Sequence, residues 1–255
     1  MNLPRRLRPG EEATLYEHLG ELRGRLIVCL VSIALGFIVA FVFHDHLVRS
    51  LEHALPANRR HLVTFGVTEP FMTSLWVSLW AGFALALPIV LWQMWSFLAP
   101  ALQEHTQRTV TVFVFCATAL LACGLAFGYY LALPASVHFL TNYDSNHFDI
   151  VVRAKDYYAF TSFLLLGVAL SFEVPVFVLG LVRLRILSAA RLRGSWRFGI
   201  FAMTALGVLL PGVDPVSTTL SVVTLNLLYG LAIGLASFFE PRWRATSTAE
   251  AATDV

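Results

Sequence analysis

Charged residues are scarce in this sequence: Asp, Glu, Lys and Arg make up 13% of its 255 residues, whereas 57% are hydrophobic. So little polar material cannot cover the surface of a soluble globule of this length. The net charge of +2 is also too small to indicate a nucleic-acid partner. The composition, with a mean hydropathy of +0.70, therefore places the chain in a lipid bilayer.

Cysteine is rare as well, and its three copies, Cys29, Cys116 and Cys123, all lie in apolar runs. No His or Cys stands near them at the spacing of metal ligands, and the pattern does not suit a disulfide framework. No Ser, His, Cys or Asp constellation typical of an active site is recognisable either. We therefore predict no enzymatic activity, no cofactor and no bound metal.

Six apolar stretches approach the ~20 residues that a helix needs to cross ~30 Å of hydrocarbon. They cover about 26–43, 71–98, 109–133, 159–182, 196–210 and 216–239. The sequence thus predicts an all-α polytopic membrane protein, with a cytoplasmic amphipathic segment over 1–25, a six-helix domain over 26–239 and a disordered tail over 240–255. The fifth stretch is short, roughly 22 Å as a helix. Asp214 and Pro215 in the turn after it are typical of a helix start, so that stretches five and six form a hairpin.

Arginine and lysine gather in alternate loops of this arrangement. Residues 1–25, 99–108, 183–197 and 240–255 hold thirteen of them, whereas 44–70, 134–158 and 211–215 hold five. Because cytoplasmic flanks carry the excess of positive charge, both termini are predicted to be cytoplasmic.

Acidic residues stand beside the first apolar stretch, in "EHLGELRGRL" over 17–26. Glu17, Glu21 and Arg25 follow one another at steps of four and share one face of a helix, while leucines form another face. Two interpretations remain open. Glu21 either pairs only with Arg25, or it binds a cationic ligand from the cytoplasm, where a guanidinium can dock on a carboxylate in bidentate fashion.

A second acid, Glu173, lies within the fourth stretch, about nine residues from its cytoplasmic end. An ionised carboxylate at that depth costs on the order of 2.5–3.5 kcal/mol, so it should face protein or water. Pro175 is expected to kink the helix and free a backbone carbonyl near residue 171. Glu173 could be a buried hydrogen-bonded acid, a contact for a partner helix, or a proton carrier. The last interpretation would make the chain a proton-coupled small-molecule transporter.

Three other polar residues have ordinary structural explanations. Glu69, just before Pro70, is expected to cap the long second helix. Thr218 and Asn226 are expected to form hydrogen bonds between helices, worth roughly 0.6 kcal/mol on average.

Four segments, in this order and spacing, resemble TatC, the large polytopic subunit of the twin-arginine protein translocase. They are "HLGELRGRL" (18–26), "LPIVLWQMWSFLAPAL" (87–102), "SFEVPV" (171–176) and Asp214 in the last short turn. The resemblance covers nearly the whole chain and implies six spans with a concave groove in the membrane plane. It also implies a receptor in a proton-motive-force-driven translocase of the bacterial plasma membrane, which exports folded proteins with twin-arginine signal peptides. Small single-span partner subunits of the TatA and TatB type, and further copies of the chain itself, are implied as partners.

The resemblance also assigns roles to individual residues. Glu21 stands where the family places its principal acidic contact for the arginine pair. The second family acid is absent, because Thr106 follows His105 here; Glu104 could replace it, although a step of two residues points a helical side chain elsewhere. The signal-peptide site is thus predicted at Glu21, Phe97, Gln103, Glu104 and Thr106. The partner groove is predicted at Glu173, Asp214 and Thr218.

Overall fold

The computed structural model describes residues 15–56, 60, 62–98, 106–145, 147, 150–210 and 214–253. Within these residues every regular element is a helix, apart from one isolated β-bridge between Val63 and Arg153. The helices are α1 (Leu15–Val42), α2 (His44–Glu52), α3 (Glu69–Leu98), α4 (Thr106–Phe127), the π-helix η3 (Gly128–Ala132), α5 (Leu133–Asn142), α6 (Ala154–Ser171), α7 (Val174–Arg183), α8 (Ala189–Gly194), α9 (Trp196–Leu209) and α10 (Pro215–Thr253).

Five helical segments in the described residues are long and apolar enough to cross a membrane. They are Leu19–Val42, Glu69–Phe97, Thr111–Asn142, Ala154–Arg183 and Pro215–Pro241. The remaining predicted span is the shorter apolar helix α9, whose 14 residues reach about 21 Å. The prediction of an all-α polytopic membrane protein is confirmed, and α9 is the element too short to cross the hydrocarbon in a straight line.

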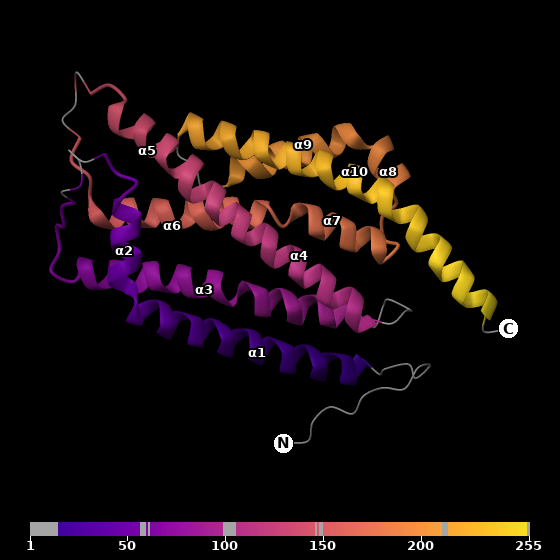
Figure 1. Ribbon diagram of the computed structural model, residues 1–255. Helices are drawn as coiled ribbons and strands as arrows, with labels where there is room; N and C mark the ends of the chain where they lie inside the picture. Colours follow the sequence, from indigo (N-terminus) through magenta and orange to yellow (C-terminus); the bar gives the residue numbers. More distant parts are fainter. Residues whose placement is uncertain are drawn as a thin grey trace.

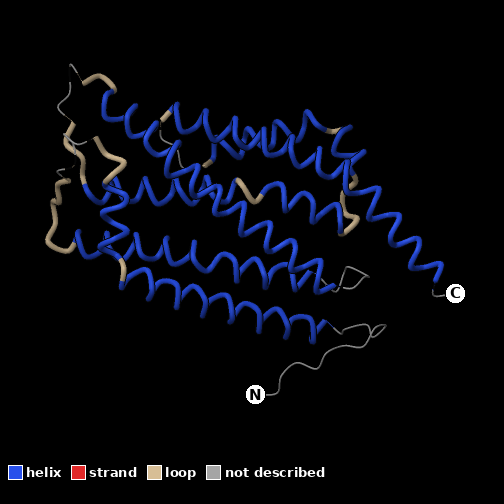
Figure 2. The backbone as a smooth tube through the Cα atoms, viewed as in Figure 1, coloured by secondary structure: helices blue, strands red, loops and turns tan. Residues whose placement is uncertain are grey.

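The helices run up and down in one bundle, as Figures 1 and 2 show. α1 begins, α3 ends, α4 begins, α7 ends and α8 lies at one end of it, which we call the basic end (Figure 1). α2 and the end of α5 lie at the opposite end. The basic end takes its name from the arginines of these elements, of the turn after α7 and of the start of α9: Arg23, Arg25, Arg183, Arg185, Arg191, Arg193 and Arg197.

α1 packs along α3, and their backbones touch where both helices carry a glycine. A Cβ atom on Gly36 would collide with the carbonyl group of Gly82, and a Cβ on Gly82 would collide with the backbone of Phe37. Small residues permit such close approach between membrane helices, which are held together by van der Waals contact because lipid supplies no hydrophobic drive. This contact fixes the register of α1 on α3.

The fourth predicted span consists of two helices, α6 and α7, with a break at Phe172 and Glu173. Pro175 stands in the first turn of α7, where its missing N–H is tolerated. Just before it, Glu173 N–H donates to the Leu170 carbonyl in a tighter turn. The helix is therefore interrupted just before Pro175, and Glu173 stands at the interruption.

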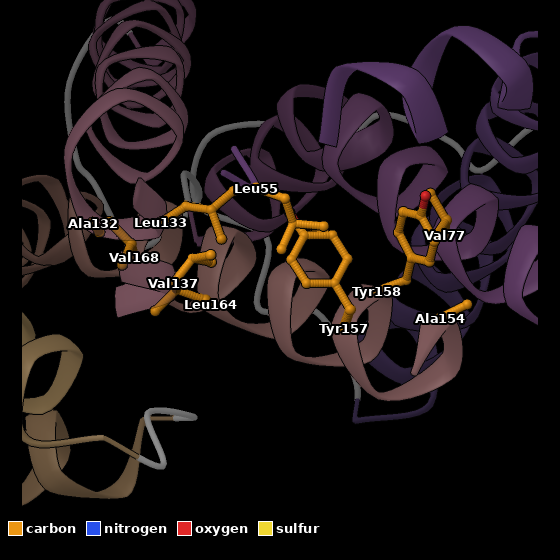
Figure 3. Packing of buried hydrophobic residues seen from close by; sticks show 10 residues of the cluster. All are labelled: Leu55, Val77, Ala132, Leu133, Val137, Ala154, Tyr157, Tyr158, Leu164 and Val168. Carbon is orange, nitrogen blue, oxygen red and sulfur yellow. The ribbon is translucent and has the colours of Figure 1, made fainter. Parts of the chain in front are cut away.

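A buried cluster ties α2 to α6 at the end opposite the basic end. Leu55 packs against the ring of Tyr157 in this cluster (Figure 3). The Tyr157 hydroxyl donates to the Leu51 carbonyl at 2.6 Å, and the Tyr158 hydroxyl donates to a Glu52 carboxylate oxygen at 2.8 Å. The last turn of α2 leaves carbonyl groups without helical partners, and the Tyr157 hydroxyl satisfies one of them. The Tyr158 hydroxyl instead satisfies a side-chain carboxylate.

Glu69 has a different role from the predicted helix cap. It receives the Arg153 guanidinium in bidentate fashion, Nε to Oε1 at 2.8 Å and Nη2 to Oε2 at 3.1 Å, and it also accepts from Phe65 N–H at 3.1 Å. Hydrogen bonding to Glu69 raises the pKa of Arg153. The pair joins the start of α3 to the residue before α6. It lies beside the β-bridge, in which the Val63 N–H donates to the Val152 carbonyl and the Ala154 N–H donates to the Val63 carbonyl.

The end of the chain also differs from the prediction. Disorder is expected from residue 240, but α10 continues to Thr253. Its last part, "ATSTAEAAT" over 245–253, is rich in alanine, the best helix former, and no glycine interrupts it.

Candidate functional site

The acid predicted at the membrane boundary, Glu21, lies at the basic end and is paired with Arg25 one helical turn later. Arg25 Nε and Nη2 both donate to Glu21 Oε1, at 3.0 and 2.6 Å. The Glu21 side chain is 29% exposed and the Arg25 side chain is 23% exposed. The predicted ion pair within the helix therefore forms, but it is not confined to α1.

Arg25 also reaches across to the end of α3. Its Nη1 donates to the Gln93 backbone carbonyl at 3.4 Å and to the Gln93 side-chain oxygen at 3.3 Å, and its Nη2 donates to the Ser96 carbonyl at 3.1 Å. The Ser96 carbonyl lies in the last turn of α3, where carbonyl groups lack helical partners and carry the negative end of the helix dipole, so a cation is stabilised there. Glu21 is thus held between α1 and α3 through Arg25.

The contact between Gly36 and Gly82 explains why these residues meet. α1 and α3 are antiparallel, and Arg25 and Gln93 each lie eleven residues, or about three turns, from that contact toward the basic end. Three whole turns return both side chains to the facing sides of their helices. The sequence reveals the pair of Glu21 and Arg25, but only packing reveals Gln93 and Ser96.

The other residues predicted at this end are placed in part. Phe97 is half-buried in the last turn of α3. Thr106 is the first residue of α4, and its side chain lies outside the description, as do Gln103 and Glu104. The second half of the predicted signal-peptide site stays a prediction.

The second acid, Glu173, is buried at the break between α6 and α7. It is 2% exposed, and neither carboxylate oxygen has a hydrogen-bond partner among the described residues. A buried polar group without a partner loses its hydration without compensation, at a cost of about 1–3 kcal/mol. The interpretation of Glu173 as a hydrogen-bonded acid that holds the fold is therefore not supported.

Trp95 of α3 lies on the face of α7 that carries Glu173. Its indole ring occupies the space where Gly180 would bear a Cβ, and it packs with Val176 in one buried cluster. Glu173, Val176 and Gly180 recur at steps of three and four, so they share one face of α7. The indole Nε1 is buried and, like the Glu173 oxygens, has no partner in the described part of the chain. Sequence reasoning did not predict the contact of Trp95 with α7. The available signal was Gly180, two turns after Glu173, because a glycine leaves room for a large side chain from a neighbouring helix.

The turn before α10 matches its prediction. Asp214 is 2% exposed, and its carboxylate accepts hydrogen bonds from the Ser217 N–H at 2.8 Å and from the Ser217 hydroxyl. α10 begins with Pro215. Asp214 is thus the predicted helix cap, and a contact with a partner subunit stays a prediction for Asp214 and Thr218.

α9 and α10 form the predicted hairpin, joined within the membrane by a polar contact. The Asn226 amide donates to the Thr204 hydroxyl at 3.1 Å and to the Val222 carbonyl at 2.9 Å. This confirms the expected hydrogen bond between helices for Asn226. The described residues contain no cluster of three His, Cys, Asp or Glu side chains that could hold a metal ion.

Fold and site together define a polytopic helical membrane protein with a half-exposed acid at its basic end and a buried acid at a break within the membrane. Residues 17–223 match the family described as Sec-independent protein translocase protein (TatC). The chain belongs to the TatC family. This family serves protein translocation, which favours the receptor interpretation over a small-molecule transporter.

Known TatC proteins match this chain over nearly its whole length. The chain is 32% identical over 234 residues to the TatC protein of Deinococcus radiodurans, covering 89% of this chain and 87% of that protein. It is 34% identical over 238 residues to the TatC protein of Koribacter versatilis, covering 91% and 88%. A crystal structure of the twin-arginine translocase receptor TatC superposes with a TM-score of 0.76 at 26% identity, covering 87% of this chain and 98% of that one.

Proposed function

We propose that this chain is the receptor subunit of a twin-arginine translocase and that Glu21 binds the paired arginines of signal peptides. The observation that carries the proposal is the pairing of Glu21 with a guanidinium at the basic end. A half-exposed carboxylate that already accepts one guanidinium has the charge and the geometry to accept another. Phe97, Gln103, Glu104 and Thr106 complete the proposed site.

The proposal requires the basic end to face the cytoplasm of a bacterial plasma membrane, with both termini on that side. Its support is the arginine content of α7, α8 and the start of α9, where Arg183, Arg185, Arg191, Arg193 and Arg197 stand within fifteen residues. A signal peptide arriving from the cytoplasm then meets Glu21 first.

Glu173 is proposed to take part in the next step, inside the membrane. A buried carboxyl group without a partner gains a hydrogen bond when a polar group on an arriving helix comes within reach. Glu173 would therefore favour helices that carry such a polar group. The apolar stretch of the signal peptide and the small single-span TatA- and TatB-type subunits are the proposed occupants, with Thr218 and Asp214 on the partner side. Several copies of the chain would assemble in the receptor complex, and the proton-motive force, worth ~2.3 kcal/mol per unit charge per 100 mV, would drive transport.

Site-specific photo-crosslinking tests the recognition step. Gly24 lies one turn after Glu21, and no atom of the described residues lies within 4 Å of the position that its Cβ would take, so a photoreactive residue fits there. Gly194 in α8, at the same end, is equally open among the described residues and is the matched control. We expect position 24 to crosslink a twin-arginine precursor in membranes and to lose that crosslink with a twin-lysine precursor and in Glu21→Gln. Equal crosslinking of both precursors would exclude Glu21 as an arginine receptor.

A further inference from the structure

Arg25 uses all three nitrogen atoms of its guanidinium in the structure. Nε and Nη2 hold Glu21, while Nη1 and Nη2 also hold Gln93 and the Ser96 carbonyl at the end of α3. Its place is therefore fixed by α3 as well as by Glu21. If Glu21 were to shift, Arg25 would still have acceptors at Gln93 and Ser96.

The carboxylate of Glu21 is engaged on one side only. Both N–H groups from Arg25 go to Oε1, and Oε2 accepts no hydrogen bond from any described residue. A carboxylate offers about four lone-pair sites, two on each oxygen. Two sites on Oε2 are therefore left for a second guanidinium, which can bind there as Arg25 binds Oε1.

The surface of α1 beside Glu21 is open among the described residues. Gly20 and Gly24 have no atom of these residues within 4 Å of the position that a Cβ would take. A peptide can therefore lie against the bare backbone of α1 beside the acid.

We infer that Arg25 is a positioning residue that gives the Glu21 site its preference for arginine over lysine; this rests on the proposed function. With Oε1 clamped to α3, the carboxylate presents Oε2 in one orientation, and the planar fork of a guanidinium makes full use of a fixed acceptor. A carboxylate that is free to rotate can bind a compact ammonium group as well as it binds a guanidinium. The preference for arginine is therefore lost when Arg25 no longer holds Glu21. Arg25 does not itself bind the signal peptide and acts only through Glu21.

The test is the binding of a fluorescent twin-arginine signal peptide and its twin-lysine variant to the full-length protein in nanodiscs, by anisotropy. For Arg25→Gln and Arg25→Lys we expect arginine-peptide affinity to fall about tenfold with lysine-peptide affinity nearly unchanged, so that the ratio of the two falls about tenfold. Arg23→Gln, which removes an exposed arginine two residues away, is the matched control and should leave the ratio within about twofold.

Three outcomes overturn the inference. A gain in arginine-peptide affinity in Arg25→Gln would make Arg25 a competitor for Glu21. An equal loss for both peptides would show a structural role only, and unchanged affinities for both peptides would show no role. Should Arg25→Gln fail to fold, Gln93→Leu removes one Arg25 acceptor, and we expect it to reduce the ratio about two- to threefold. Glu21→Gln separates the two proposals: if it binds both peptides as the parent protein does, the receptor proposal itself fails.

Discussion

Replacing Glu173 with an apolar side chain of similar shape should make the protein more stable and stop it from working. Glu173 is 2% exposed, and both of its carboxylate oxygens lack a hydrogen-bond partner among the described residues. An unsatisfied buried polar group costs about 1–3 kcal/mol, and Glu173→Met removes that cost while it keeps the length of the side chain. We therefore expect the free energy of unfolding to rise by about 1–3 kcal/mol, or roughly 2–4 °C in midpoint per kcal/mol.

Unfolding is measured in detergent by heating or by denaturant, with tryptophan fluorescence as the signal. Export of a twin-arginine reporter protein is measured in cells in parallel. We expect Glu173→Met to lose export, because the carboxyl group that an arriving helix would satisfy is gone. Glu173→Gln keeps a hydrogen-bonding group and should retain most of the export, whereas Glu173→Ala should lose it.

A gain in stability combined with a loss of export identifies a residue kept for function at the expense of the fold. Two results would refute the reasoning. If Glu173→Met lowers the free energy of unfolding by more than about 1 kcal/mol, the acid has a stabilising partner. If export fails equally in Glu173→Gln and Glu173→Met, the ability to ionise, and not hydrogen bonding, is the property that matters.

Three further sets of substitutions test the packing of the helices, each by unfolding in detergent. Tyr158→Phe and Glu52→Gln should each lower the free energy of unfolding by about 1–2 kcal/mol, and the double substitution by clearly less than their sum; additivity would mean that their 2.8 Å hydrogen bond contributes nothing. Asp214→Ala should cost about 1 kcal/mol through loss of the α10 cap, whereas Asp214→Asn, an equally good cap, should cost little. Gly180→Ala should cost about 1–3 kcal/mol because its Cβ would displace the Trp95 ring, and Gly194→Ala, with open space around it, should be neutral; similar values for the two would contradict the packing.

Local sequence signals predicted those features of the fold that depend on residues close together in the chain. Hydrophobic length located the spans, Pro175 located the break between α6 and α7, and Asp214 located the start of α10. Glu21 and Arg25 were expected to pair because four residues make about one helical turn. The tail after residue 240 was misjudged because small polar composition outweighed the helix propensity of its alanines.

Contacts between distant parts of the chain were beyond such signals. Glu69 reads as a helix cap beside Pro70, yet its partner is Arg153, 84 residues later. The acceptors of Arg25 on α3 are 68 and 71 residues away. Nothing in the local pattern selects these partners, because hydrogen-bond donors and acceptors at such separations meet only through helix packing.

By itself, then, the sequence determined that this is a polytopic membrane protein and which side chains are chemically out of place in it, because burying a charge in lipid is costly wherever it occurs. Tertiary structure alone decided what those side chains meet. The Gly36 and Gly82 contact sets the register that clamps one oxygen of Glu21 and leaves the other open. The packing of α6 and α7 leaves Glu173 buried without a partner among the described residues, because the helices around it were positioned by close contact of apolar surfaces.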